Sequence, residues 1–236
     1  MAMLHRILLP ALMALSLLAA PAVRAEQPVL VELFTSQGCS SCPPADRLLG
    51  ELAKDRRVVA LSFHVDYWDY LGWKDTFASR ANTQRQGNYV GMTDRSGIRQ
   101  RLRGKFTPEV VVQGTHSFVG HDRLQIAASI VEHSGAAERA VITLAGGRAT
   151  LTPKAAGLPE TRVLLARFDP EASVEIARGE NAGRTISYHH VVTELSELGT
   201  WTGDAEMAIE IPGSGSYAVF LQEGPAGPIL AAASTR

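Results

Sequence analysis

The chain has 236 residues, which is enough for one large domain or for two small domains with separate cores. Hydrophobic residues make up 45% of the chain and charged residues 20%, as in an ordinary globular protein. The formal net charge is −1, and nucleic-acid binding would require a basic face, so the composition argues against a nucleic-acid partner.

Residues 1–25 have the pattern of a signal peptide. A weakly basic start precedes the apolar run Ile7–Ala20, Pro21 ends any helix, and Val23 and Ala25 stand at −3 and −1 of a cleavage point. A membrane anchor is the competing interpretation, but this run is shorter than the roughly 20 residues of a transmembrane helix. We therefore expect a periplasmic or secreted protein that has no contact with a membrane after cleavage.

The next segments alternate between strand and helix patterns. Val29–Thr35 is an apolar run with β-branched residues, which predicts a buried strand. A helix is predicted from near Cys39 to about Lys54, because apolar residues recur at helical spacing and two prolines occupy the first turn, where proline is tolerated. A second buried strand is predicted at Val58–Val65.

The segment Asp66–Lys105 is predicted to be mostly helical. Two strands, Glu109–Gln113 and Ser117–Val119, follow it, and Asp122 is predicted to cap a final helix. The resulting order, β-α-β-α-β-β-α, is that of the thioredoxin fold. We therefore predict an α/β thioredoxin-like N-terminal domain at residues 26–136.

Beyond residue 136 the helical periodicity is absent. Short apolar runs alternate with turn signals, which predicts an all-β, sandwich-like C-terminal domain at residues 137–236. The expected strands are Ala140–Ala145, Arg148–Thr152, Val163–Phe168, Val174–Ala177, Thr185–Leu195, Ala205–Ile211, Tyr217–Gln222 and Ile229–Ala233.

Both cysteines of the chain lie in the sequence Cys39-Ser40-Ser41-Cys42, between the first predicted strand and the first predicted helix. A helix N-terminus stabilises a thiolate, because its free N–H groups and positive dipole end lower the thiol pKa. We expect Cys39 to be the more exposed, attacking sulfur, and Cys42 to resolve a mixed disulfide. The motif therefore predicts a redox-active or metal-binding dithiol.

Two other interpretations of the cysteine pair are open. One is a permanent structural disulfide, although so short a loop removes little chain entropy. The other is a zinc site. The chain has no second cysteine pair, so histidines such as His64 and His121 would have to complete that site.

Thr107 and Pro108 form a second candidate feature. A proline before a β run is commonly just the start of an edge strand. In a thioredoxin-like domain, this proline is typically cis and lies against the dithiol. The backbone of Thr107 would then be free to pair with a bound peptide.

Glu32 is the one acid of the first predicted strand, which leads directly to the cysteines. A partly buried carboxylate there would have a raised pKa and could pass a proton to or from Cys42. The alternative is that Glu32 points to solvent at the end of the strand.

Two further segments stand out by composition. His64–Trp73 contains four aromatic residues and two acids, which could line a groove for a partner, but the core of a helical insertion is the favoured interpretation. Arg178–Thr185 contains two glycines and an asparagine, which predicts a tight turn before a strand and suggests no chemical role.

Four motifs resemble one family of secreted proteins. They are Val31–Asp46 (VELFTSQGCSSCPPAD), Phe63–Trp73 (FHVDYWDYLGW), Thr107-Pro108 before a valine run, and Gly179–Gly183 (GENAG). On these motifs the chain resembles the proteins catalogued as domain of unknown function 1223, over nearly the whole mature chain. The resemblance implies a thioredoxin-like protein with its dithiol at Cys39 and Cys42 and a β-rich C-terminal part. The chain departs from the family pattern in the arginine-rich segment Gln86–Lys105 and at His190, where the family favours Asn.

Three functions are compatible with these features. The leading hypothesis is thiol–disulfide exchange without a cofactor, with protein thiols or disulfides of the exported compartment as partners. The alternative is a Cu(I) chaperone, in which the thiolates of Cys39 and Cys42 bind the metal. In a third hypothesis the β-rich part binds a partner protein and the dithiol is a minor switch.

Overall fold

The computed structural model describes residues 27–90 and 104–235, so the predicted signal peptide and part of the segment Asp66–Lys105 lie outside the described residues. Strands contain 43% of the described residues and helices 17%. The strands are β1 (Val29–Thr35), β2 (Val58–His64), β3 (Glu109–Val112), β4 (His116–Val119), β5 (Ala140–Ala145), β6 (Arg148–Pro153), β7 (Thr161–Ile176), β8 (Arg184–Trp201), β9 (Met207–Glu210), β10 (Tyr217–Gln222) and β11 (Ile229–Ser234). The helices are α1 (Pro43–Leu52), the 3-10 turn η1 (Asp69–Leu71), α2 (Arg80–Asn88) and α3 (Arg123–Ser134).

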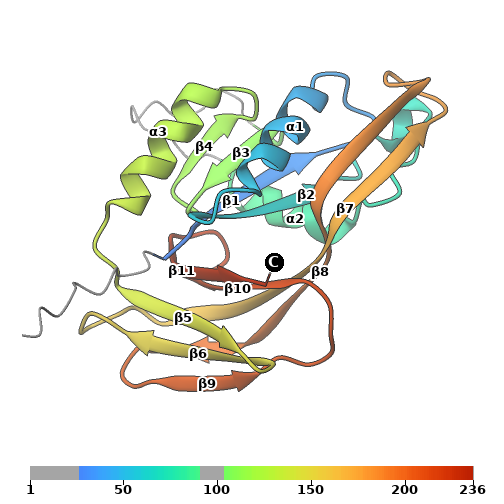
Figure 1. Cartoon of the computed structure of the whole chain (residues 1–236). Coiled ribbons are helices and arrows are strands. Elements are labelled where there is room, and N and C mark those ends of the chain that lie inside the picture. The colour runs from blue at the N-terminus through green and yellow to red at the C-terminus, as the bar shows by residue number, and fades with distance from the viewer. Residues whose placement is uncertain (1–26, 91–103, 236) are drawn as a thin grey trace, which may run out of the picture.

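Eight strands form one mixed sheet in the order β11-β10-β7-β8-β2-β1-β3-β4 (Figure 1). β1 and β2 are parallel, whereas β3 is antiparallel to β1 and β7 is antiparallel to β8. The two halves of this sheet join where β8 pairs in parallel with β2, through Ser62 and Val191. β5, β6 and β9 form a second, three-stranded sheet.

The predicted fold class is therefore wrong. A thioredoxin-like α/β domain followed by an all-β domain would place the strands before and after residue 136 in different sheets. Instead, β1 to β4 share the large sheet with β7, β8, β10 and β11. The described chain is mostly β. Within the segment expected to be mostly helical, the described part contains only η1 and α2.

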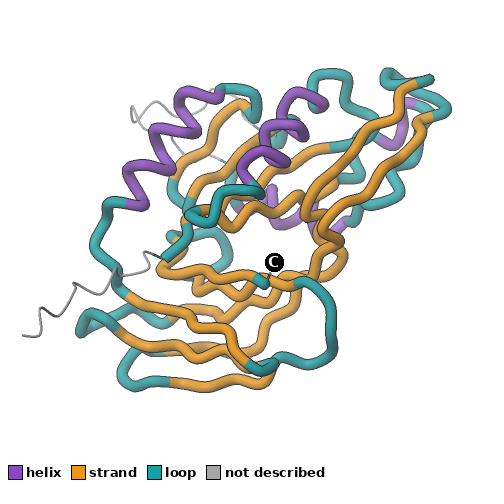
Figure 2. Tube along the Cα trace, viewed as in Figure 1, coloured by secondary structure: helices purple, strands orange, loops and turns teal. Residues whose placement is uncertain are grey.

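Both faces of the central strands are covered, which is why β1 and β2 are buried along their whole length. On one face, residues such as Leu33 pack against α1 and α3. On the other face, Phe34 packs in a cluster with Tyr89, which follows α2, and with Phe220 on β10. The small sheet faces strands of the large one (Figure 2). A third cluster, around Trp201, contains residues of both sheets.

β7 and β8 form a long antiparallel hairpin that reaches beside α1 (Figure 1). Strand β8 of this hairpin packs closely against α1. A Cβ atom at Gly50 would overlap the ring of His189 on β8, so glycine is the residue that fits there. The tip of the hairpin, at residues 177–183, thereby comes to lie against the loop that precedes α1.

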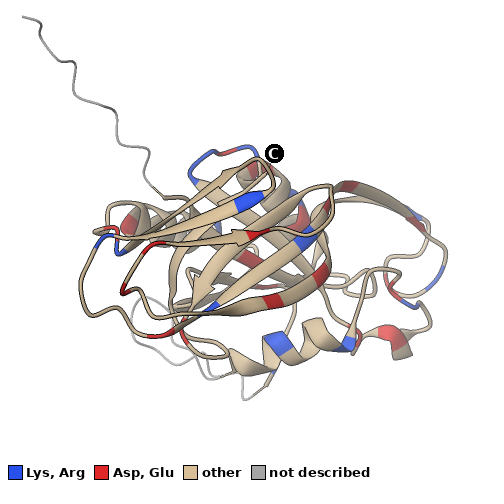
Figure 3. Cartoon of the chain, turned by 90° about the horizontal axis from the view of Figure 1, so that it is seen from below, with Lys and Arg blue, Asp and Glu red and all other residues tan. Residues whose placement is uncertain are grey.

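Acidic and basic residues are interspersed on the face seen in Figure 3. Exposed ion pairs join Arg148 to Glu210 and Arg162 to Glu197 across neighbouring strands. Such surface pairs stabilise a protein by at most about 1 kcal/mol each. No described helix has the length and the apolar character that crossing a membrane requires.

Candidate functional site

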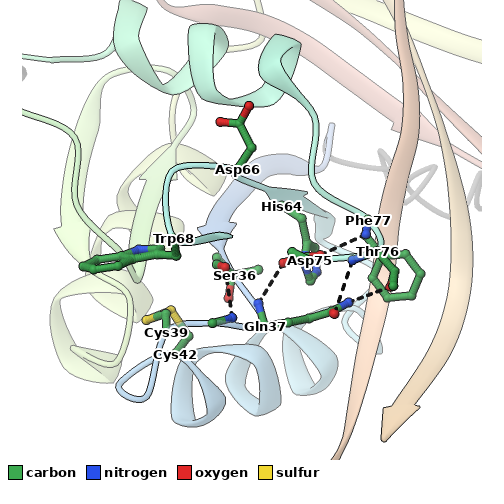
Figure 4. Close-up of polar contacts among 12 residues, drawn as sticks. Ser36, Gln37, Cys39, Cys42, His64, Asp66, Trp68, Asp75, Thr76 and Phe77 are labelled. Carbon is green, nitrogen blue, oxygen red and sulfur yellow. Dashed lines mark hydrogen bonds and ion pairs between the residues drawn. A yellow bond between two sulfur atoms is a disulfide. The ribbon is translucent and has the colours of Figure 1, made fainter. Parts of the chain in front are cut away.

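Cys39 and Cys42 form a disulfide at the start of α1 (Figure 4). Cys42 is the N-cap residue of this helix, and Pro43 begins its first turn. Cys39 is 4% exposed and Cys42 is 0% exposed, while Ser40 and Ser41 between them are exposed. Both cysteines are thus buried, and Cys39 is slightly more exposed than Cys42.

The peptide bond between Thr107 and Pro108 is cis, as the sequence predicts, and Trp68 connects Thr107 to the disulfide loop. The indole N–H of Trp68 donates to the Thr107 hydroxyl over 2.7 Å, and Trp68 also packs against Gly38 in the loop. Among the described residues, the backbone N–H and carbonyl of Thr107 form no hydrogen bond.

Trp68, which is half-buried, and Tyr70, which is exposed, form an aromatic surface near the disulfide. Their rings stack with centres 6.2 Å apart, and Tyr70 is 77% exposed. The sequence favoured a helical core for this segment. The structure instead places the two aromatic residues around the short turn η1, with Trp68 above the cysteines (Figure 4).

Polar side chains form a buried cluster beneath the loop. Thr35 and His64 end the parallel strands β1 and β2, so they lie at the same edge of the sheet. Thr35 Oγ1 donates to Asp46 Oδ1 over 2.8 Å, and His64 Nδ1 lies 2.8 Å from Asp75 Oδ2. Asp75 Oδ2 also accepts from the backbone N–H of Gln37 over 2.7 Å. The cluster therefore ties the cysteine loop to the strand ends.

Asp46 lies one helical turn after Cys42, and its backbone N–H donates to the Cys42 carbonyl over 3.1 Å. Burial raises the pKa of Asp46 to about 7, although the charge of His64 and the hydrogen bond from Thr35 oppose the rise. Its second oxygen, Oδ2, has no hydrogen-bond partner in the described part of the chain. Asp46 can therefore bind or release a proton near neutral pH.

Asp75 differs from Asp46. Burial acts to raise the pKa of Asp75, but the charge of His64 and the hydrogen bonds from His64 and from the backbone N–H groups of Gln37 and Phe77 hold it below its ordinary value. Asp75 is therefore a fixed acceptor at neutral pH, and Asp46 is the acid of this cluster that can exchange a proton.

Glu32 does not lie on the side of the sheet that carries Cys42 and Asp46. It is fully buried, so it does not point to solvent, and it lies on the face of β1 opposite to α1. Glu32 Oε1 accepts from Arg85 Nε over 2.5 Å, and Oε2 accepts from the Tyr89 hydroxyl over 2.7 Å. The carboxyl group on the side of Cys42 is that of Asp46, and Glu32 is instead one half of a buried ion pair.

Replacing Arg85 with alanine should lower the free energy of unfolding by about 3–5 kcal/mol, because the charge of Glu32 would stay buried without its partner. Urea unfolding of the oxidised protein measures this difference. Arg123 is a matched control, since it pairs with Glu51 on the surface. Its replacement with alanine should leave the free energy of unfolding almost unchanged, because solvent screens an exposed pair. An equally small loss for Arg85→Ala would contradict a stabilising role for the buried pair.

Asn181 contacts the cysteine loop from the tip of the β7–β8 hairpin. Its side chain is buried, and its Nδ2 donates to the carbonyls of Gln37 and Cys39, each over 2.9 Å. The sequence predicts a turn here, which is confirmed, but suggests no role for it. The carbonyl of Cys39 is thus held by a residue 142 positions further along the chain.

A family model described as Protein of unknown function (DUF1223) matches residues 30–222. The chain belongs to this family. The DUF1223 match includes the disulfide, the cis peptide bond and Asn181. The resemblance that the sequence motifs indicate is therefore confirmed.

Two solved structures are similar to this DUF1223 chain. A crystal structure of an Agrobacterium tumefaciens protein is 32% identical, covers 89% of this chain and 95% of its own, and has a TM-score of 0.71. HBP35 of Porphyromonas gingivalis is 15% identical, covers 89% of this chain and 75% of its own, and has a TM-score of 0.54, which is a likeness of fold alone. No curated protein matches the chain.

Metal binding by this DUF1223 protein would depend on the two cysteines. The described residues contain no group of three or more His, Cys, Asp and Glu side chains that could hold a metal ion. His64 contacts Asp75 instead, and His121 is exposed in the turn before α3. The Cu(I) hypothesis names the thiolates of Cys39 and Cys42 as ligands, and it stays a prediction.

The sequence contains a signal for Asp46 that the motifs alone do not bring out. In a helix that starts at Cys42, the residues Asp46 and Leu49 follow at four and seven positions, so both lie on one face. Leu49 belongs to the core beneath α1. An acid on the apolar face of a DUF1223 helix is a candidate for a perturbed pKa. No comparable pattern marks Asn181, because its contacts depend on the hairpin.

Proposed function

We propose that the Cys39–Cys42 disulfide is redox-active and exchanges with protein thiols and disulfides in an exported compartment. The observation that carries this proposal is the buried carboxyl group of Asp46, with a pKa of about 7, one helical turn from Cys42. A permanent disulfide needs no proton acceptor beside it. Thiol–disulfide exchange does need one, because the thiolate is the reactive form of cysteine.

Reduction of a substrate disulfide would proceed in two steps. The thiolate of Cys39 attacks one substrate sulfur, so that a Cys39–substrate disulfide forms and the other substrate sulfur leaves as a thiolate, which takes up a proton. Asp46 then accepts the proton of the Cys42 thiol, and the Cys42 thiolate attacks the Cys39 sulfur. The Cys39–Cys42 bond forms, the substrate leaves as a second thiolate, and two electrons have passed to it. The reverse sequence oxidises a substrate dithiol.

Thr107 would bind the backbone of the substrate next to its reacting cysteine. The N–H and carbonyl of Thr107, which form no hydrogen bond with any other described residue, suit an extended peptide, because such a peptide pairs through backbone hydrogen bonds. Trp68 and Tyr70 lie beside this position and offer apolar contact area. A peptide bound there would pass over the surface where Cys39 is reached.

The reduction potential of the cysteine pair tests the proposal. The mature protein is equilibrated in glutathione and dithiothreitol buffers, and free thiols are counted by mass tagging. We expect reversible equilibration above about −300 mV, as for oxidoreductases between about −120 and −270 mV. A value below about −300 mV is typical of a structural disulfide and would overturn the proposal.

A further inference from the structure

The tip of the β7–β8 hairpin places two consecutive side chains on the loop that carries Cys39. Asn181 is the first contact, through its hydrogen bonds to the loop carbonyls. Its Oδ1 accepts from Arg184 Nη1 over 2.9 Å, so the amide group is fixed with its N–H side toward the loop. The position of the hairpin tip relative to Cys39 is therefore defined by a buried, fully bonded side chain.

Glu180 is the second contact. Its Oε2 accepts from the backbone N–H of Ser40 over 3.2 Å. This N–H is the first backbone donor after Cys39. Glu180 is exposed and forms no ion pair with any described residue. Its carboxylate therefore brings a negative charge to the residue next to Cys39.

The two oxidation states of the cysteine pair respond differently to this charge. The disulfide is neutral. Its reduction by two molecules of glutathione adds two electrons, yields one glutathione disulfide, and creates a negative charge at Cys39 whenever that sulfur is a thiolate. A second negative charge nearby repels the thiolate. Glu180 also occupies a backbone N–H that would otherwise be available to stabilise the thiolate.

We propose that Glu180, positioned by Asn181, lowers the reduction potential of the Cys39–Cys42 pair. This inference rests on the proposed function, since the value of the potential matters only for a pair that cycles between its disulfide and dithiol states. Glu180 and Asn181 are positioning residues, because they act on Cys39 and touch no substrate. The hairpin of the second half of the chain is thereby a working part of the redox site in the first half.

The test is the reduction potential of Glu180→Gln in glutathione buffers. The substitution keeps the shape of the side chain and removes its charge, so the equilibrium should shift toward the dithiol by about threefold, which is about +14 mV for a two-electron couple. Glu180→Lys should shift it by about tenfold, or about +30 mV. Both shifts should shrink in about 1 M salt, which screens exposed charges.

Glu171 provides the matched control, because it is an exposed acid on β7, opposite His189 in the β7–β8 register and outside the hairpin tip. Glu171→Gln should leave the potential unchanged. In an Asn181→Ala background, the shift caused by Glu180→Gln should fall at least about twofold, because Glu180 is no longer held on the loop. An undiminished shift there would overturn the positioning role of Asn181.

The outcomes separate this inference from the proposed function. If the unaltered protein has a potential below about −300 mV, the proposed function fails. If that protein cycles normally but Glu180→Gln has the same potential, only the role of Glu180 is overturned. A shift that persists unchanged in about 1 M salt would also overturn it, because a charge effect at an exposed site must be screened.

Discussion

Replacing Cys42 with serine should leave the protein covalently trapped on its substrates through Cys39. Without the second thiol, the mixed disulfide lacks its internal attacking group and persists. Cys39 is 4% exposed and Cys42 is 0% exposed, so we expect a substrate to react with Cys39. We expect on the order of tenfold more trapped protein from Cys42→Ser than from Cys39→Ser. Acid-quenched mixtures with an unfolded, disulfide-containing protein, analysed on non-reducing gels and by mass spectrometry, measure this difference.

The double variant Cys39→Ser/Cys42→Ser gives the background of this experiment. Equal trapping by the two single variants would contradict Cys39 as the attacking residue. An absence of trapping by Cys42→Ser would contradict exchange with protein substrates altogether. The linked substrate peptide can be mapped by mass spectrometry, and it should be attached at Cys39.

The cysteine motif and the Thr107–Pro108 bond could be predicted because their signals are local. Two cysteines between a β run and a helical run need no distant partner, and a residue pair before a strand is read directly from the chain. Asp46 has a local signal as well, but its pKa depends on contacts with Thr35 and His64 across two strands. The sequence shows that Glu32 lies within a strand, but it does not show which face of the sheet the Glu32 side chain occupies.

The fold class could not be predicted, because it depends on the pairing of distant strands. The order of elements up to α3 agrees with the structure. That order does not reveal that the free edge of β2 is covered by β8, through Ser62 and Val191. The full length of the β7–β8 hairpin could not be predicted from the sequence either. Strand β7 continues through the exposed residues around Asp169, where the apolar pattern ends although the strand does not.

Replacing Asp46 with asparagine should slow the second step of exchange, in which Cys42 attacks the mixed disulfide, by about 100-fold. The amide keeps the size of the side chain and can still accept from Thr35, but it cannot accept a proton. Single-turnover oxidation of the reduced protein by oxidised glutathione, with acid quenching, separates the two steps. The first step, at Cys39, should keep its rate.

The pH profile distinguishes proton transfer from a structural effect of this substitution. In the unaltered protein the rate of the second step should rise as the pH passes about 7, where Asp46 becomes ionised. Asp46→Asn should lack this rise. The two rates should converge near pH 8.5, because a free thiol then ionises without help.

The free energy of unfolding should also depend on pH in a predictable direction. The pKa of Asp46 is raised in the folded protein above its ordinary value of 3.8, so the folded state holds the proton more tightly than the unfolded state does. The free energy of unfolding therefore falls as the pH rises from about 4 to about 7. Asp46→Asn should remove this loss, which amounts to up to about 4 kcal/mol at pH 8.

Glu109 provides a control that separates the effect of Asp46 on stability from its effect on the rate of the second step. Burial also raises the pKa of Glu109 to about 7, but its carboxyl group lies on the other face of the sheet and accepts from Ser117 and Gln86. Glu109→Gln should therefore change the pH dependence of stability and leave the rate of the second step unchanged. If Asp46→Asn behaves in the same way as Glu109→Gln, Asp46 is not the proton acceptor of Cys42, and the proposed redox function loses the observation that carries it.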